Sequence, residues 1–219
     1  MTTISKRGFK FLNHKFFIKA NLALVMFGLL TACSTMRVNV SNKMLIPAYT
    51  RIGVAAFANH SDTPLANRQV ETMVVGLLRA RGFCNIKQFQ HVQSCAKLLY
   101  CPDETLSKRA ILSWARANRL TYVVTGAANE WRYKVGLDGE PVAGAALTMI
   151  NVHTGQIVWT GVGSIIGGSR SGLDVVGQSM LQWMIFNNLC PISGPIGVPV
   201  KSTILVPVKA QVNAARYTK

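Results

Sequence analysis

Three stretches of the chain hold side chains that could do chemistry, and the first is His60-Ser61-Asp62. These are the residue types of a hydrolase triad, in which a serine attacks, a histidine takes its proton and an aspartate orients the histidine. Such groups converge from distant positions, whereas three adjacent residues cannot reach the required geometry. Ser and Asp also favour turns that cap a following helix. This stretch therefore predicts a turn and not a catalytic centre.

The second stretch, Gly136-Leu137-Asp138-Gly139-Glu140, holds two carboxylates that could act as an acid and a base. Glycine on both sides of Asp138 favours a solvated turn instead. The third, Gly161-Val162-Gly163-Ser164 with Gly167-Gly168, could cradle a phosphate, but no Lys-Ser or Lys-Thr pair follows it. No stretch combines a nucleophile, a base and stabilising donors. We therefore predict a binding or assembly module that is not an enzyme and needs no cofactor.

The N-terminus has the layout of an export signal. A basic region precedes an apolar run, Leu22 to Leu30, which is too short to span a bilayer. Leu30-Thr31-Ala32-Cys33 then resembles the bacterial lipobox, in which the cysteine takes a diacylglycerol and becomes the mature N-terminus. A plain signal peptide with an accidental cysteine is the alternative. We expect residues 1–32 to be a lipoprotein signal peptide and Cys33 to carry acyl chains such as palmitate, which anchor a protein when several are present.

Two features after the signal bear on location and partners. Ser34 stands where an Asp would resemble an inner-membrane retention signal, so we expect the outer membrane, with residues 33–50 as a lipidated N-terminus and polar tether. The formal net charge is +16, from 24 Lys and Arg against 8 Asp and Glu, and five of the basic residues lie in the signal. The mature chain keeps 19 against 8, a net of +11. The charges are scattered without a nucleic-acid motif, which favours an anionic membrane surface over nucleic acid.

Four further cysteines are present: Cys84, Cys95, Cys101 and Cys190. An exported protein can keep disulfides, and four cysteines allow three full pairings that the sequence does not choose among. The short spacing makes Cys95 with Cys101 our first expectation for a bridge. We expect no metal site, because no CxxC pair occurs and the histidines have unrelated spacings.

The hydrophobic pattern predicts an α/β sandwich with one mixed sheet and helices packed on it. The expected order is β-α-β-α-β-β-β-α: a buried strand 51–57, a helix 65–81, a short strand 84–87, a helix opened by Pro102-Asp103-Glu104, strands 121–133, 142–152 and 156–164, and a final helix started by a capping box at Ser171-Gly172-Leu173-Asp174. A tight hairpin is expected at His153-Thr154-Gly155. The Pro-containing basic tail, 189–219, is read as an extended arm.

Aromatic residues differ in their expected places. Trp159 alternates with Ile157 along a strand and is predicted to lie in the core. Trp131 instead sits among charged neighbours, in the run Trp131-Arg132-Tyr133-Lys134 at a strand end. Arg, Trp and Tyr are the residue types enriched at interface hot spots. We therefore predict that these four residues form a contact between subunits.

Several of these stretches resemble the PelC family of lipoproteins. The resemblance covers about 51–188 and rests on Phe57 to Ala66, Leu78 to Phe83, Thr125-Gly126, Val152 to Trp159 and, most specifically, Glu130-Trp131-Arg132-Tyr133-Lys134-Val135-Gly136-Leu137-Asp138-Gly139-Glu140-Pro141. More distantly, the layout is similar to the N-terminal domains of CsgG-type and TolB-type proteins and to LpoB-type lipoproteins. The family tends to carry a membrane-facing aromatic residue after the last strand, where this chain has glycine near Gly167-Gly168.

The resemblance implies a non-catalytic outer-membrane lipoprotein on the periplasmic side. Its subunits would form a homo-oligomeric ring that assists export of the Pel exopolysaccharide, a biofilm polymer, together with an outer-membrane porin carrying a repeat scaffold. Asp138 would face the ring's interior, with Glu140 beside it, as the residues that meet the polymer. The basic balance of the mature chain leaves the charge of that polymer open. The alternative is a monomeric LpoB-like accessory lipoprotein that binds and activates a periplasmic cell-envelope enzyme.

Overall fold

The computed structural model describes residues 34–91, 106–136 and 139–192. The described residues from Thr35 to Ile192 belong to one compact unit, and the description below concerns them alone. Cys33, Asp138 and the expected Cys95–Cys101 bridge lie outside the described residues, as does the tail from residue 193.

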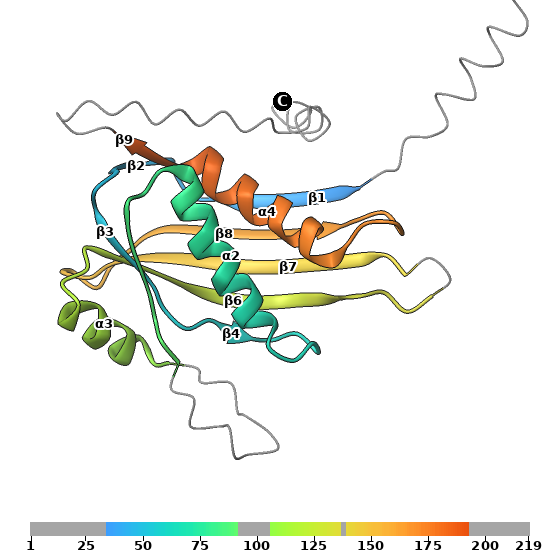
Figure 1. Ribbon diagram of the computed structural model, residues 1–219, viewed down its shortest axis with the longest axis horizontal. Coiled ribbons are helices and arrows are strands. Elements are labelled where there is room, and N and C mark those ends of the chain that lie inside the picture. The colour runs from blue at the N-terminus through green and yellow to red at the C-terminus, as the bar shows by residue number, and fades with distance from the viewer. Residues whose placement is uncertain (1–33, 92–105, 137–138, 193–219) are drawn as a thin grey trace, which may run out of the picture. The chain divides into compact units, whose positions relative to one another are not determined.

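Most strands belong to one seven-stranded mixed sheet (Figure 1). Six of them follow the order β1-β8-β7-β6-β3-β5, and the seventh, β4, pairs with β6 after the residues of β6 that pair with β3. Strand β3 runs parallel to β5 and β6, whereas β6, β7, β8 and β1 pair antiparallel. The strands are β1 (Thr35–Val40), β2 (Met44–Pro47), β3 (Arg51–Val54), β4 (Ala58–Asn59), β5 (Asn85–Gln88), β6 (Tyr122–Tyr133), β7 (Pro141–Asn151), β8 (Ile157–Ile166) and β9 (Leu189–Ile192), and the helices are α2 (Ala66–Arg81), α3 (Lys108–Ala117) and α4 (Leu173–Asn188).

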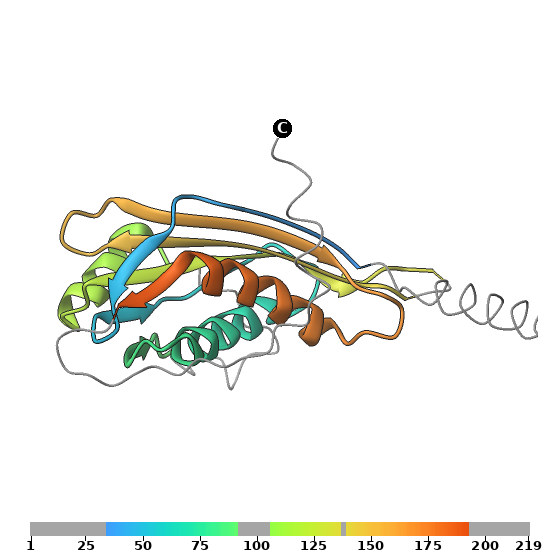
Figure 2. The same cartoon turned by 90° about the horizontal axis from the view of Figure 1, so that it is seen from above.

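The sheet is covered unequally on its two faces. Helices α2 and α4 lie on one face and enclose the larger core (Figure 2), which includes Val124, Trp131 and Trp159. Val123, the neighbour of Val124 in β6, points the other way into a smaller core with α3. Helix α3 covers only one end of that second face. No described helix covers the rest of it, over β6, β7, β8 and β1, and the candidate site lies there.

The structure confirms the predicted fold class and the central element order. The helix expected at 65–81 is α2, and the three consecutive strands are β6, β7 and β8. The tight hairpin between β7 and β8 is also present, with a positive φ of 71° at Gly155. The side chain of Asn151 closes this turn, because its Oδ1 accepts hydrogen bonds from the backbone N–H of His153 (2.9 Å) and Thr154 (3.2 Å).

Folded strands lie outside the expected domain, 51–188, on both sides. Much of the stretch interpreted as a tether is folded: β1 pairs with β8 along six residues, and β2 pairs in parallel with β9. Exposed and half-buried residues alternate along β1, with Met36, Val38 and Val40 packed against the core. Polar residues at every other position make this segment look like a linker, although period-two alternation is the pattern of a half-buried strand. Strand β9 likewise lies within the expected tail, 189–219.

Two predicted helix starts also differ from the structure. Pro102-Asp103-Glu104 lie outside the described residues. Helix α3 begins at Lys108, and Ser107 caps it by accepting a hydrogen bond from Ala110 N (3.2 Å). Helix α4 has Gly172 as its N-cap and no side-chain cap, so the predicted capping box is absent. Instead, the Tyr133 hydroxyl at the end of β6 accepts a hydrogen bond from Leu173 N (3.0 Å). This contact joins the first turn of α4 to the strand end.

Candidate functional site

A row of four residues crosses the uncovered face of the sheet. Glu130 of β6 lies opposite Gly144 of β7, Gly144 opposite Ser164 of β8, and Ser164 opposite Arg37 of β1. Residues that pair across neighbouring strands point to the same face. The row therefore places a carboxylate, a position without a side chain, a hydroxyl and a guanidinium side by side on one surface.

A β-bulge in β6 puts Glu130 into this row. The register with β7 shifts between Ala128 and Glu130, so that Asn129 is an extra residue. Without the bulge, strict alternation from Val124 and Ala128, which both face the helices, would send Glu130 into the core. The extra residue reverses the alternation. Glu130 consequently faces the open side, and Trp131 faces α4.

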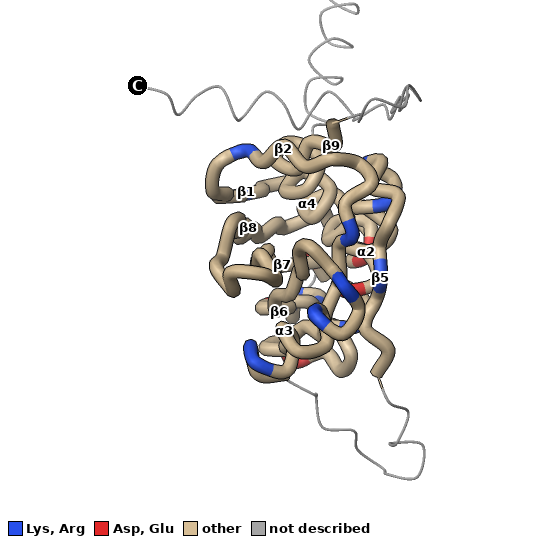
Figure 3. The backbone as a smooth tube through the Cα atoms, turned by 90° about the vertical axis from the view of Figure 1, so that its left-hand side faces the viewer, with Lys and Arg blue, Asp and Glu red and all other residues tan. Residues whose placement is uncertain are grey.

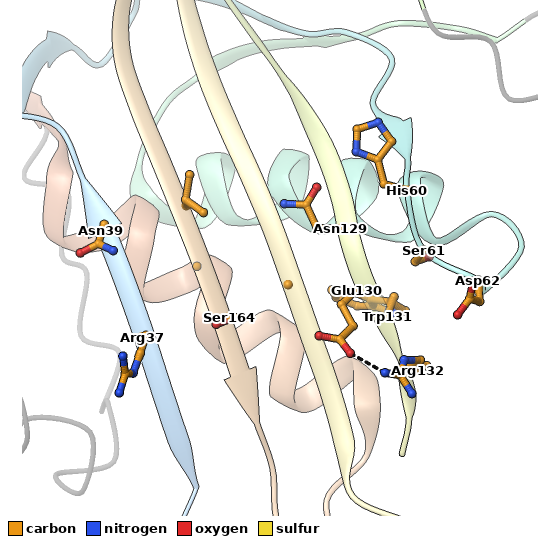
Figure 4. A pocket seen from close by; sticks show the side chains of 13 residues that line it. Arg37, Asn39, His60, Ser61, Asp62, Asn129, Glu130, Trp131, Arg132 and Ser164 are labelled. Carbon is orange, nitrogen blue, oxygen red and sulfur yellow. Dashed lines mark ion pairs between the residues drawn. The ribbon is translucent and has the colours of Figure 1, made fainter. Parts of the chain in front are cut away.

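The loop after β4 makes one wall of a trough over this row. Backbone N–H of His60 donates to Ala128 O (2.8 Å), and the Thr63 hydroxyl donates to Trp131 O, so the loop is held against β6. His60, Ser61 and Asp62 line the trough on this side, and Arg37 and Asn39 line it on the other (Figure 4). The hollow has a volume of about 530 Å³.

The charges that line the trough balance. Glu130 Oε1 and Arg132 Nη2 form an ion pair at 2.9 Å, with about two-fifths of each side chain exposed. They are two residues apart on one strand and so share a face. Within the described residues, Arg37 and Asp62 form no ion pair. Two guanidinium and two carboxylate groups give the trough a formal charge of zero. Elsewhere along the described backbone, Lys and Arg occur on several separate elements (Figure 3).

The structure gives His60-Ser61-Asp62 a turn geometry. The Ser61 hydroxyl donates to Asn59 Oδ1 (2.8 Å), and the side chain of Asn59 also donates to Thr63 O (2.9 Å). No hydrogen bond joins Ser61 to His60 in the described part of the chain. Ser61 therefore closes a turn, as the residue types of this stretch predict.

Trp131 is not a contact residue for a neighbouring subunit, contrary to the prediction from its charged neighbours. The side chain is 0% exposed and lies under α4, where Gly177 gives its ring room. Arg132, Tyr133 and Lys134 are exposed at the same strand end, and Tyr133 keeps 51% of its surface. Trp159, 1% exposed, lies in the core as predicted.

Glu140 is tied to the strand end opposite it. Its carboxylate pairs with Lys134 Nζ at 3.0 Å, and its carbonyl accepts a hydrogen bond from Lys134 N at 2.8 Å. Gly139 has a positive φ of 50°, which permits the tight return of the chain. The carboxylate of Glu140 thus lies beside a cation at the base of the β6–β7 hairpin.

A second polar cluster, which the sequence does not suggest, is buried beside α2. Glu71 is 1% exposed, and its oxygens lie 2.9 and 3.1 Å from His91 Nε2. Gln88 also donates to Glu71 (3.2 Å). The cluster fixes the chain after β5 against the helix. Within the described residues, no group of three or more His, Cys, Asp or Glu could hold a metal ion, and Cys84 and Cys190 are free thiols.

The trough residues that sequence reasoning missed come from strands far apart in the chain. Arg37, Gly144 and Ser164 are 107 and 20 positions apart, and only strand pairing brings them together. The available signal was period-two alternation in β1 and β8, which puts Arg37 and Ser164 on the solvent face. The register across four strands is a long-range property that no local pattern contains.

Comparisons with known proteins identify relatives by structure. No protein-family model matches the chain, and a search of curated proteins gives no match. Among solved structures, the chain is similar to the PelC dodecamer from Paraburkholderia phytofirmans, with 30% identity over 72% of this chain and 100% of that chain, at a TM-score of 0.61. A single-substitution variant of that dodecamer gives the same values. The LpoB C-terminal domain from Salmonella enterica is 18% identical over 54% of this chain and 84% of that chain, at a TM-score of 0.39.

Proposed function

Because this chain belongs to the PelC family, we propose that it is a non-catalytic outer-membrane lipoprotein whose copies form a ring that assists export of a Pel-like exopolysaccharide. The observation that carries the proposal is the match along the whole length of a PelC chain that forms a dodecamer. Within the described residues, no helix is both long and apolar enough to cross a bilayer. In this proposal, a lipid on Cys33 attaches the protein to the membrane.

The sheet begins only two residues after Cys33, which limits the distance between the proposed anchor and the domain. Strand β1 starts at Thr35, two residues after Cys33, and two residues reach at most about 7 Å. A lipid on Cys33 would hold the membrane close to the start of β1. Thr35 pairs with Ile166, so the end of β8 and the start of β7 lie at this same end of the domain. We call it the anchor end.

The candidate contact residues lie at the anchor end. A closed ring with one type of subunit joins two different surfaces of each copy. Arg132, Tyr133 and Lys134 end β6 beside Pro141 and the first turn of α4. Their exposure suits a role in subunit contact, and Trp131 beneath them holds the strand end in place. Val135 and Val175 add exposed apolar surface in the same region.

The β6–β7 hairpin supplies the groups proposed to meet the polymer. In a ring, Asp138 and Glu140 of each copy would recur around the axis, and their summed field would act on a chain passing through. Glu140 is paired with Lys134, which lowers its share of that field. Asp138 is therefore the stronger candidate. The outer-membrane porin and its scaffold would receive the polymer from the ring.

The first test is the oligomeric state of the mature lipoprotein in mild detergent. We expect one discrete species of high order by light scattering after size exclusion, at all protein concentrations above the assembly threshold. A protein that stays monomeric at every concentration would contradict the ring. Crosslinking in cells that recovers a cell-wall synthase, with no porin, would favour the accessory lipoprotein instead.

The second test separates assembly from polymer handling. An Asp138→Ala variant should form the ring and lose most polymer secretion, measured by lectin binding to the culture supernatant. Glu140→Gln is the matched control and should lose less, because Lys134 already neutralises that carboxylate. Unchanged secretion by the Asp138→Ala variant would remove this residue from the mechanism.

A further inference from the structure

Packing within the described residues does not require a glycine at position 144. It lies in the interior of β7, where a glycine weakens a strand and often marks a place that a ligand or another backbone approaches closely. A Cβ at Gly144 would lie 3.5 Å from the nearest atom, Glu130 Cβ, which is an ordinary contact. By contrast, a Cβ at Gly126 would lie 2.1 Å from Ala146 O, and one at Gly177 2.0 Å from Trp131. Packing requires those two glycines but not Gly144.

The space left above Gly144 is surrounded by groups that both donate and accept hydrogen bonds. The Glu130–Arg132 pair lies on one side of it, and Ser164 and Arg37 lie on the other, in register across the sheet. Asn39 and Asn129 each add an amide with both functions (Figure 4). Val162, 52% exposed, continues the floor with an apolar surface. The trough therefore combines a flat small-residue floor with planar polar walls.

We propose that this trough is a carbohydrate-binding subsite that takes uncharged, N-acetylated sugar units. A sugar ring presents hydroxyl groups that must each be matched by donors and acceptors, and the Glu130–Arg132 pair with Arg37 and Asn39 offers both. Its flat C–H face fits over Gly144 and Val162. The proposal rests on the proposed function, in which the partner is a polysaccharide, and it assigns that polymer a contact distinct from Asp138.

The charges in the trough exclude the other ligand classes. The two carboxylates, Asp62 and Glu130, cancel the charge of the two guanidinium groups, so the trough has no net attraction for a phosphate or another anion. A divalent cation would need several convergent oxygen ligands, yet Glu130 is already paired with Arg132. An apolar peptide would leave the guanidinium of Arg37 buried without a partner. Since the formal charge of the trough is zero, an N-acetylated sugar is favoured over its cationic, deacetylated form.

The test uses the mature lipoprotein, two probes and three proteins. The probes are fully N-acetylated and fully de-N-acetylated chito-oligosaccharides, followed by saturation-transfer NMR and by calorimetry. The proteins are the wild type, Gly144→Val and Thr148→Val. Valine is favourable in strands, and a Cβ at position 144 would meet no backbone atom closer than 3.6 Å. Thr148 lies on the same face of β7 outside the trough, so Thr148→Val is the matched control.

We expect the wild type and Thr148→Val to bind the N-acetylated oligomer. Gly144→Val should lose at least about tenfold in affinity, because its side chain occupies the place of the sugar ring. The melting temperature and the ring should stay unchanged in both variants. Equal affinity of Gly144→Val and wild type, or binding of only the deacetylated oligomer, would overturn the proposal. A ring lost in Gly144→Val would also overturn it, because the trough would then be a subunit contact.

The same experiment separates this proposal from the proposed function. A wild-type ring that binds neither oligomer refutes the subsite and leaves the ring standing. A monomer that binds the N-acetylated oligomer, with the loss in Gly144→Val, refutes the ring and supports the subsite. Arg37→Gln gives a second test, because it removes the guanidinium group from the wall and should weaken sugar binding while leaving Gly144 in place.

Discussion

Replacing Gly177 with alanine should destabilise the domain strongly, because the new methyl group meets the ring of Trp131. A Cβ on Gly177 would lie 2.0 Å from Trp131 Cη2 and 2.7 Å from two further ring atoms. The ring is 0% exposed, and the Thr63 hydroxyl bonds to the backbone carbonyl of Trp131, so the indole has little freedom to move. Overpacking of a core costs about 1–3 kcal/mol, and three short contacts place this case at about 3 kcal/mol.

Thermal unfolding followed by circular dichroism checks this value. For a domain of this size, about 3 kcal/mol corresponds to a fall of roughly 6–12 °C in melting temperature. All variants must be compared at one protein concentration, since assembly itself raises the melting temperature. A Gly177→Ala variant that melts within about 1 °C of the wild type would refute the packing of Trp131 against α4.

A second substitution makes the argument specific to the contact. Trp131→Phe removes the outer ring atoms that the Gly177→Ala methyl group would meet. Trp131→Phe alone should destabilise by leaving a cavity, but the double variant should be more stable than the sum of the two losses predicts. Additive losses would mean that the two residues do not touch. Trp131→Ala should cost about 3–5 kcal/mol, which is the signature of a core residue and not of a subunit contact.

Three further changes test other parts of the structure. His91→Ala should lower the free energy of unfolding by about 2–3 kcal/mol in urea titrations, because it leaves the buried Glu71 carboxylate short of a partner. Replacing an exposed histidine would change this free energy little. Lys134→Ala should change it by less than about 1 kcal/mol, since the pair with Glu140 is two-fifths exposed on each side. Cys33→Ser should move the protein from the membrane pellet to the soluble periplasmic fraction, and retention in the pellet would contradict the lipid anchor.

The central elements were predictable because each has a local signature. Helix α2 has an apolar stripe at helical spacing, and β6, β7 and β8 are apolar runs separated by turn residues. Strand β1 was missed because its polar residues, Arg37 and Asn39, hide their alternation with Val38 and Val40. Its stability comes from pairing with β8, more than a hundred residues away, and no local propensity reports such a pairing.

The prediction for Trp131 failed for one physical reason, the β-bulge at Asn129. Charged neighbours on both sides suggest an exposed strand end, and simple alternation from Val124 would also put position 131 on the open face. The bulge at Asn129 inserts one residue and moves every later side chain of β6 to the opposite face. One residue thus buries Trp131 and brings Glu130 into the trough. The composition of the run gives no sign of it, since the bulge is defined by the register with β7.

The short distance between Cys33 and β1 changes what the anchor can do. A flexible tether would let the domain turn freely below the membrane, and its position in a ring would depend on subunit contacts alone. With a reach of about 7 Å, a lipid on Cys33 would instead restrict which end of the domain can approach the bilayer. That end holds Tyr133 and the base of the β6–β7 hairpin. Under the proposed function, anchoring and subunit contact therefore act on the same end of the sheet, and each copy is oriented before the ring closes.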